Sequence, residues 1–204
     1  MAEPYPDNWS SIVHGPIWRF IGFFALHQHD LLTRFKRRSL NLEGEGFKVK
    51  GIVVYDTSYG NTKKIAQTIA ETLKESGIEV DLFDVKDVKK LSARDYGFLV
   101  LGSPTRFGTM SFAMRGFLGK VKSEEWMSKP FTAFDTENPE NIEKKEGSAA
   151  EKIAEKLKDK RMNQLLPVLK AVVEGQKGPL KEGEIQRTKD YTSELVTKLK
   201  EEKV

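Results

Sequence analysis

Short apolar runs alternate with longer amphipathic segments from residue 49 to the end of the chain. The runs are continuous and rich in β-branched and aromatic residues, which is typical of strands buried on both faces of a parallel sheet. The segments between them carry apolar residues at helical spacing. We therefore predict strands at 50–56, 78–83, 97–102, 130–134 and 170–174, and helices at 61–76, 87–92, 110–121, 148–160 and 184–202.

This alternation predicts an α/β domain over residues 49–204, built on a doubly wound five-stranded parallel sheet. Residues 160–170 fit the pattern poorly, and one interpretation continues the preceding helix up to Pro167. In doubly wound sheets, ligands bind at the carboxyl ends of the strands, where the strand order reverses. The loops after the first and third predicted strands are therefore the candidate sites.

The first of these loops, residues 56–62, joins an apolar run directly to a helical pattern. Backbone N–H groups at a helix start attract anions, and the hydroxyl groups of this loop add further donors. The lysine-containing P-loop pattern and the G-x-G-x-x-G dinucleotide pattern are both absent. A phosphate site without a metal is one interpretation, and an ordinary helix cap at Asn61 or Thr62 is the other. The candidate phosphate ligands are Thr57, Ser58, Gly60, Asn61 and Thr62.

The second loop follows the apolar run 98–101 and reads Gly102-Ser-Pro-Thr-Arg-Phe-Gly108. A flat heterocycle needs an apolar face, backbone N–H groups and glycines that allow close approach. This second loop offers these features, and we expect it to lie next to the first loop at the edge of the sheet. The simpler interpretation makes Phe107 a core side chain and Gly108 a turn residue, but two such loops at two strand ends favour a ligand site.

These two loops resemble those of the flavodoxin family. Thr57-x-x-Gly60-Asn61-Thr62 is similar to the family's first loop, which holds the phosphate of FMN, and residues 102–108 look like the second flavin loop of flavodoxin-like quinone reductases and related flavodoxins. The resemblance covers residues 49–204 and implies FMN as the cofactor. The cofactor-binding residues that it implies are Thr57, Ser58, Tyr59, Gly60, Asn61, Thr62, Ser103, Pro104, Thr105, Arg106, Phe107, Gly108, Asp135 and Thr136.

Two further segments support the resemblance less strongly. The Phe-Asp-Thr segment ending at Thr136 is similar to one found in several flavodoxin-like proteins, whose third loop closes on the ring edge. Residues 137–147 are acidic and polar, so they either shield the ring or form a solvated loop. Residues 172–175 and 177–183 resemble the tail of the same family and indicate no chemistry of their own.

The resemblance implies an FMN-binding electron carrier that shuttles electrons between redox partners. The alternative is an FMN-dependent NAD(P)H:quinone-type oxidoreductase, and a non-redox binding module is a third class. The chain has no cysteine, so redox chemistry must come from an organic cofactor. No histidine follows His29, so we expect no general acid of neutral pKa in the core, which counts against turnover of a second substrate.

The charge of the chain departs from the family pattern, because flavodoxins are usually acidic. The 34 Lys and Arg residues exceed the 30 Asp and Glu residues, which gives a formal net charge of +4. The excess is spread along the chain, so we expect no nucleic-acid partner. A basic carrier instead favours an acidic redox partner.

Residues 1–48 lie outside the resemblance, and we predict a helical extension with aromatic and basic residues, joined by a linker at 41–48. It is either an arm packed on its own domain or on a second copy in a homo-oligomer, a peripheral membrane anchor, or a docking segment. Its charged residues make it too polar to span a bilayer, and its acidic start does not fit a secretory signal. We expect a cytoplasmic protein, membrane-associated if the anchor interpretation holds, and no metal site at His27 and His29, whose spacing separates the two rings.

Overall fold

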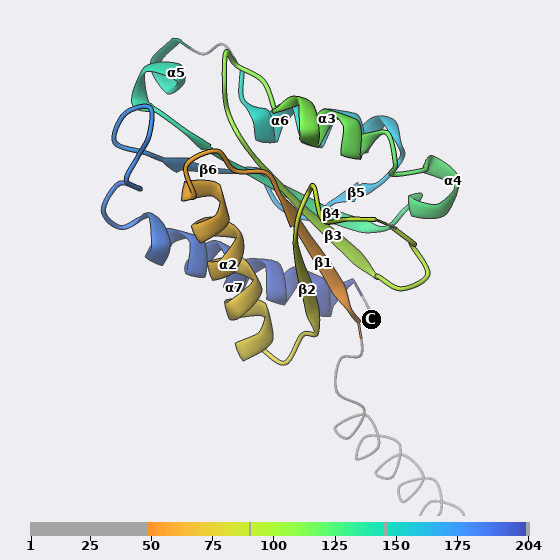
Figure 1. The fold of residues 1–204 in the computed structure, drawn as a ribbon. Coiled ribbons are helices and arrows are strands. Elements are labelled where there is room, and N and C mark those ends of the chain that lie inside the picture. Colours follow the sequence, from red (N-terminus) through yellow and green to blue (C-terminus); the bar gives the residue numbers. More distant parts are fainter. Residues whose placement is uncertain (1–48, 90, 145–146, 203–204) are drawn as a thin grey trace, which may run out of the picture. The chain divides into compact units, whose positions relative to one another are not determined.

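A parallel sheet forms the centre of the computed structural model, which describes residues 49–89, 91–144 and 147–202 (Figure 1). The strand order is β2-β1-β3-β4, and two short strands, β5 and β6, share the position beyond β4. Every pairing is parallel. The strands are β1 (Gly51–Tyr55), β2 (Val80–Asp84), β3 (Phe98–Pro104), β4 (Pro130–Glu137), β5 (Asn163–Gln164) and β6 (Leu169–Val172).

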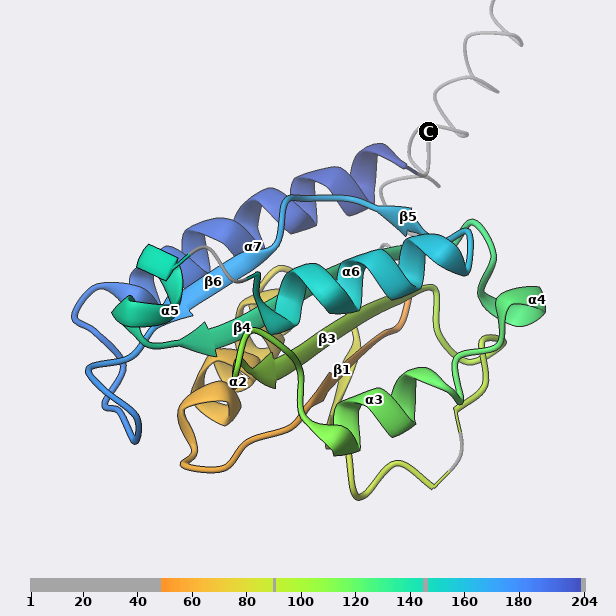
Figure 2. The same cartoon turned by 90° about the horizontal axis from the view of Figure 1, so that it is seen from above.

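Helices cover both faces of this sheet, as Figures 1 and 2 show. The long helices α2 (Asn61–Glu75) and α7 (Glu184–Glu201) lie side by side on one face. The other face is covered by α3 (Phe112–Leu118) and α6 (Ala149–Asp159). Two short helices, α4 (Ser123–Trp126) and α5 (Pro139–Lys144), lie at opposite ends of the sheet. The predicted doubly wound α/β architecture is confirmed.

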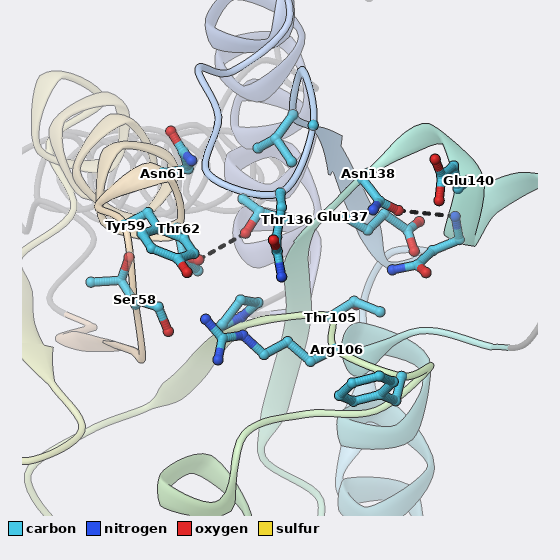
Figure 3. A pocket seen from close by; sticks show the side chains of 17 residues that line it. Ser58, Tyr59, Asn61, Thr62, Thr105, Arg106, Thr136, Glu137, Asn138 and Glu140 are labelled. Carbon is cyan, nitrogen blue, oxygen red and sulfur yellow. Dashed lines mark hydrogen bonds between the residues drawn. The ribbon is translucent and has the colours of Figure 1, made fainter.

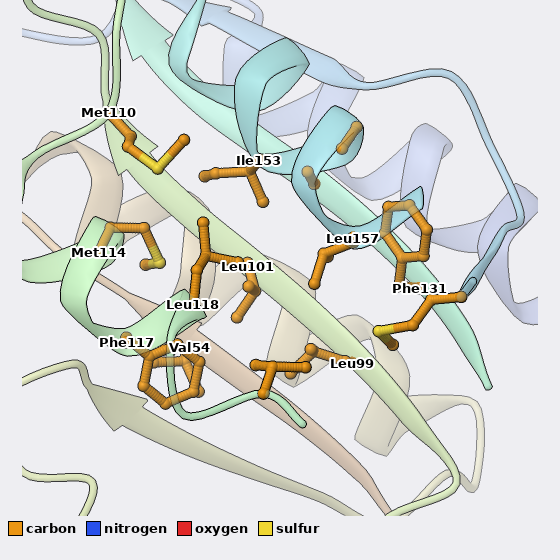
Figure 4. Close-up of a cluster of buried hydrophobic side chains, with 14 of the residues drawn as sticks. Val54, Leu99, Leu101, Met110, Met114, Phe117, Leu118, Phe131, Ile153 and Leu157 are labelled. Atoms are coloured by element: carbon orange, nitrogen blue, oxygen red, sulfur yellow. The ribbon is translucent and has the colours of Figure 1, made fainter. Parts of the chain in front are cut away.

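The core consists of two apolar layers, one on each face of the sheet. The layer beneath α3 and α6 contains side chains from β1, β3 and β4 together with both helices, and Figure 4 shows Leu101 packed between Met114 and Ile153. The layer beneath α2 and α7 is built from the alternate residues of the same strands. Burial on both faces explains why the strands read as continuous apolar runs.

The fifth position of the sheet differs from the prediction. The preceding helix does not continue to Pro167, because α6 ends at Asp159 and Arg161 has a positive φ of 60°. The backbone then becomes extended, and the N–H groups of Asn163 and Leu165 donate to carbonyl oxygens on or next to β4. Pro167 therefore lies between two short strands, β5 and β6, which both pair with β4.

The helix predicted at 87–92 is also wrong, since the described residues of that segment form a turn and irregular backbone. Val85 and Val88 are buried three residues apart, which imitates helical spacing, but both simply anchor the turn to the core. The helical extension and the division at residue 48 fall on residues outside the described part of the chain. Within that part, no helix is both long and apolar enough to cross a bilayer.

Candidate functional site

A pocket of about 340 Å³ opens at the carboxyl ends of β1, β3 and β4. Its size falls within the usual range for small-ligand sites. Figure 3 shows side chains from three loops surrounding it. Ten of the residues predicted for the cofactor line this pocket: Thr57, Ser58, Tyr59, Asn61, Thr62, Pro104, Thr105, Arg106, Phe107 and Thr136. The remaining four, Gly60, Ser103, Gly108 and Asp135, support the loops without lining it.

The first loop turns from β1 into α2 at Gly60, which has a φ of 86° and serves as the N-cap of the helix. No side chain caps this helix, so the N–H groups of its first turn donate to no capping side chain. The N–H of Gly60 itself donates to Oγ1 of Thr57 at 3.0 Å. The helix end therefore presents donors and a positive dipole end to the pocket.

Two side chains of this loop are held by other segments. The hydroxyls of Thr62 and Thr136 lie 2.8 Å apart and join α2 to β4, as the dashed line in Figure 3 shows. Nδ2 of Asn61 donates to the carbonyl oxygen of Lys177 at 2.9 Å. These contacts fix the loop, and they leave Thr57 and Ser58 as the hydroxyl side chains that are partly or fully exposed at the pocket.

The second loop is a tight hairpin closed by mutual backbone hydrogen bonds between Arg106 and Thr109, at 3.0 and 3.1 Å. Phe107 and Gly108 at its tip have φ values of 50° and 63°, as in a type I′ turn. A positive φ is unusual for a bulky residue, and Phe107 is also 95% exposed. Phe107 is therefore not a core side chain but an aromatic group presented at the pocket rim.

Aromatic and cationic side chains lie together at the mouth. The ring of Tyr59 is half-exposed, with Cζ of Arg106 at 5.6 Å and Nζ of Lys177 at 6.0 Å from its centroid. Exposed aromatic residues beside a pocket commonly mark a binding surface. The two cations give the mouth next to the first loop a positive character.

Asp135 lies beneath the second loop and is fully buried. Its Oδ2 accepts hydrogen bonds from the Thr105 hydroxyl at 3.0 Å and from the N–H of Ala150 at 2.9 Å. The Thr105 oxygen in turn accepts from the N–H of Ala149. Burial raises the pKa of Asp135, which these hydrogen bonds only partly offset. The carboxyl thus holds the second loop on the start of α6.

Gly102 was expected to allow close approach of a ligand, but a side chain of the protein itself fills the space beside it. A Cβ built there would lie 2.0 Å from the ring of Phe134. Ser103 is likewise fully buried, where its Oγ accepts from the N–H of Ser111 at 3.0 Å. Gly102 and Ser103 are thus packed within the protein, and Pro104, the last residue of β3, is the first residue of this segment that lines the pocket.

The third side of the pocket comes mainly from residues 137–141, which the sequence left open as either a shield for the ring or a solvated loop. Glu137, Asn138, Glu140 and Asn141 line it, and the N–H of Asn141 donates to Oδ1 of Asn138 at the start of α5. The tail segment adds three more lining residues, Val173, Gly175 and Gln176. The one signal available was position, since both segments directly follow the ends of neighbouring parallel strands.

Glu137 also corrects the expectation about acid groups in the core. Burial, with the Asp135 carboxylate as a second cause, raises the pKa of Glu137 to about 7. A group of neutral pKa therefore exists at this pocket, although the described residues contain no histidine. The same part of the chain holds no grouping of three or more side chains suited to a metal ion.

Comparison with known proteins decides the family. A family model described as "Flavodoxin domain" matches residues 52–177. The chain belongs to the flavodoxin family. A flavodoxin of Aquifex aeolicus is 38% identical over 78 residues, which cover 38% of this chain and 42% of that protein. An NAD(P)H dehydrogenase (quinone) of Methylocella silvestris is 30% identical over 92 residues, covering 35% and 46% respectively.

A solved flavodoxin from the domain Archaea superposes with a TM-score of 0.63 at 25% identity, covering 74% of this chain and 99% of the archaeal one. The chain spans less than half the length of either of these two relatives. Membership of the flavodoxin family implies FMN as the cofactor. The residues present fit it by the chemistry of their donors, since an uncapped helix start suits a phosphate and an aromatic rim suits a flat ring.

Proposed function

We propose that this flavodoxin-family chain is an FMN-binding electron carrier that passes electrons between redox partners. One observation carries the proposal. The uncapped start of α2 opens into a pocket whose rim holds two exposed aromatic side chains, Tyr59 and Phe107. An anion-binding end and an aromatic rim in one pocket match the two halves of a flavin nucleotide.

The phosphate is assigned to the first loop. The N–H groups of the first turn of α2 and the hydroxyls of Thr57 and Ser58 are the donors, and Arg106 and Lys177 add positive charge nearby. Gly60 keeps this end open, because a Cβ built on it meets no atom within 4 Å. An anion at this position would gain from the helix dipole as well as from direct hydrogen bonds.

The ring is assigned to the space between the first and second loops. Tyr59, Pro104 and Phe107 are the candidate ring neighbours, and all three line the pocket. Bound FMN supplies one- or two-electron chemistry. The protein's part is to hold the ring at the surface, where electrons can pass to a partner, and to keep one side of it in an apolar setting.

The experiment is a titration of the purified chain with FMN, followed by reduction. A carrier should bind one FMN and show the visible absorbance of an oxidised flavin. It should take up electrons from a separate reductase while oxidising NADPH slowly in the presence of a quinone. A colourless protein that takes up no FMN would contradict the proposal and favour a non-redox binding module.

A second function, an FMN-dependent NAD(P)H:quinone-type oxidoreductase, is favoured by a specific observation. Glu137 lines the pocket with a pKa of about 7, so the site has a group able to exchange protons at neutral pH. The similarity to a quinone-dependent dehydrogenase points the same way. Rapid oxidation of NADPH by the purified protein and a quinone, without any reductase, would establish the enzyme in place of the carrier.

The redox partner that the site favours is acidic. Arg106 and Lys177 lie against the exposed ring of Tyr59 at the mouth. Arg115 of α3 lies against the exposed ring of Phe112, with its Cζ 5.6 Å from the ring centroid, and its guanidinium donates to the hydroxyl of Thr109 in the second loop. Positive charge beside the cofactor would steer an acidic protein toward it and make association weaken with salt. The expectations of membrane contact and self-association rest on residues 1–48, outside the described residues.

A further inference from the structure

Glu137 combines burial with an unused hydrogen-bonding atom at the pocket wall. It is the last residue of β4, where its carbonyl oxygen accepts from the N–H of Val173 at 2.9 Å. The residue is only 2% exposed, yet it lines the pocket. Its Oε1 has no hydrogen-bond partner among the residues that the structure describes. A buried carboxyl oxygen left without a partner is costly unless a ligand or a proton satisfies it.

The charges around Glu137 favour its neutral form. Asp135 lies two residues earlier on β4, so its side chain faces the same side of the sheet. Lys170 of β6 is the nearby cation, but its Nζ lies 2.7 Å from Oε1 of Glu151 on α6. Glu140 of α5 lines the same pocket as a further acidic group. Glu137 therefore shares one lysine with other carboxylates and has no counter-ion of its own.

The pKa of Glu137 agrees with this arrangement. Burial and the charges of Asp135 and Glu151 raise it, Lys170 lowers it, and the net pKa is about 7. At neutral pH the carboxyl is thus present in both forms. A ligand that displaces water from the pocket would favour the neutral form still more, because desolvation penalises a charge.

We propose that Glu137 is a proton-carrying residue of the flavin pocket, which donates a hydrogen bond to an acceptor on the bound heterocycle when protonated and repels the anionic cofactor when ionised. This inference rests on the proposed function, since it takes FMN as the ligand of this pocket. It adds a residue that the family resemblance did not supply, and it makes cofactor binding depend on pH.

The direction of the dependence follows from linkage. If the protonated form binds flavin more tightly, bound flavin raises the pKa of Glu137, and the dissociation constant rises as pH increases through the pKa of the free protein. The limiting slope for one such group is about tenfold per pH unit. Between pH 6 and 8.5 we expect the dissociation constant to rise at least about fivefold on this basis.

The experiment measures the dissociation constant of riboflavin and of FMN by fluorescence from pH 5.5 to 9, on the full chain. Riboflavin is the primary probe because the FMN phosphate itself titrates near pH 6, as phosphate monoesters do. The wild type should show the rise, and Glu137→Gln should give a flat riboflavin profile. Glu155→Gln, which removes an exposed carboxylate from α6, is the matched control and should keep the wild-type profile.

Two further variants separate a charge effect from a merely structural one. Lys170→Met removes the cation and leaves Glu151 unpaired, so the inflection should move to higher pH. Glu151→Gln removes a negative charge and releases Lys170, so the inflection should move to lower pH. Opposite shifts from the two partners of one ion pair are expected only if Glu137 titrates in their field.

A direct readout does not involve flavin. Carbon-13 NMR of the free protein should show the Glu137 carboxyl titrating near neutral pH. An ordinary glutamate titration, or a wild-type riboflavin profile as flat as that of Glu137→Gln, would overturn the inference while leaving the proposed function standing. Absence of flavin binding at every pH would overturn the proposed function, and this inference with it.

Discussion

At the scale of single residues, the pocket depends on backbone conformations that most side chains avoid. Gly60 and Phe107 both have a positive φ, one at the start of α2 and the other at the tip of the second loop. The loop pattern predicted a special role for Gly60. The conformation of Phe107 could not be predicted from the sequence. It belongs to a turn that is closed by backbone hydrogen bonds between Arg106 and Thr109.

Gly60→Asp should weaken FMN binding by roughly two orders of magnitude, because a carboxylate would face the phosphate at the helix start. The matched control is Gly77→Asp at the other end of α2. Gly77 has a similar φ of 80° and an equally open Cβ position, so the backbone strain is alike while the phosphate is remote. Calorimetric titration with FMN checks both variants, and equal affinities for the two would place the phosphate elsewhere.

Phe107→Asn should separate stability from function. Asparagine tolerates a left-handed conformation, and with Gly108 it forms the pair favoured in type I′ turns, so the apo-protein should gain about 0.5–1 kcal/mol in unfolding free energy. Phe107 is 95% exposed, so little burial is lost. FMN affinity should nevertheless fall several-fold. Urea unfolding and an FMN titration test this, and undiminished affinity would remove Phe107 from the ring site.

The residues that sequence reasoning missed owe their roles to distant neighbours. Glu137 directly follows the Phe-Asp-Thr segment that resembles the family. Its pKa, however, depends on burial and on the charges of Asp135 in β4, Glu151 in α6 and Lys170 in β6. The lack of a nearby histidine suggested that no acid of neutral pKa was present. That expectation was wrong because burial and neighbouring charges raise the pKa of a glutamate instead. The local sequence pattern is enough to predict where a strand ends. The pKa of a side chain at that end can be predicted only when its packed neighbours are known.

At the scale of elements, the site is fixed by a junction between β4, the second loop and α6. The Thr105 hydroxyl donates to Asp135 and accepts from the N–H of Ala149, so one side chain joins all three elements. Asp135 was expected to contact the cofactor, but it is fully buried beneath the pocket. Its position suits a role in holding Thr105 in place.

Thr105→Val tests this junction, because it keeps the shape of the side chain and removes both hydrogen bonds. It should lower the unfolding free energy by about 1–3 kcal/mol, since a buried carboxylate and a helix N–H lose a partner. FMN affinity should fall as well. Ser111→Ala removes the N-cap of α3, whose Oγ accepts from the N–H of Met114, and should cost about 1 kcal/mol with FMN binding retained. Equal FMN affinities in the two variants would argue against the junction.

The strands and long helices were predictable because their apolar patterns are local and complete. The errors fell where tertiary contacts decide the backbone. Residues 160–170 contain apolar side chains at mixed spacing, and β5 lies where the edge of β4 offers backbone groups to pair with. The strand predicted at 170–174 is present as β6. The short helix α5 was likewise hidden in a polar segment, where the Asn138 side chain caps it.

At the scale of the whole molecule, the chain contains a flavodoxin-family domain, and the sequence predicts a separate extension over residues 1–48. The excess of positive charge, +4 in total, is unusual for that family and accords with an acidic partner. The interpretations of residues 1–48, as an arm, a membrane anchor or a docking segment, stay predictions. All the pocket-lining residues named above lie within the described part of the chain, between Thr57 and Gln176.

Deleting residues 1–45 should therefore leave FMN affinity within about twofold of the full chain, because every pocket residue described here is retained and so small a change is below 0.5 kcal/mol. Fluorescence titration of both forms with FMN is the measurement. A large loss of affinity would show that the extension contributes to the site, either directly or through a contact with a second copy.

The most direct test of the central claim is a crystal structure of the chain grown with FMN. We expect a phosphate bound by the backbone N–H groups at the start of α2, next to Gly60, and a ring between Tyr59 and Phe107. A phosphate bound elsewhere, or a cleft between the first and second loops filled by the protein's own side chains, would contradict it.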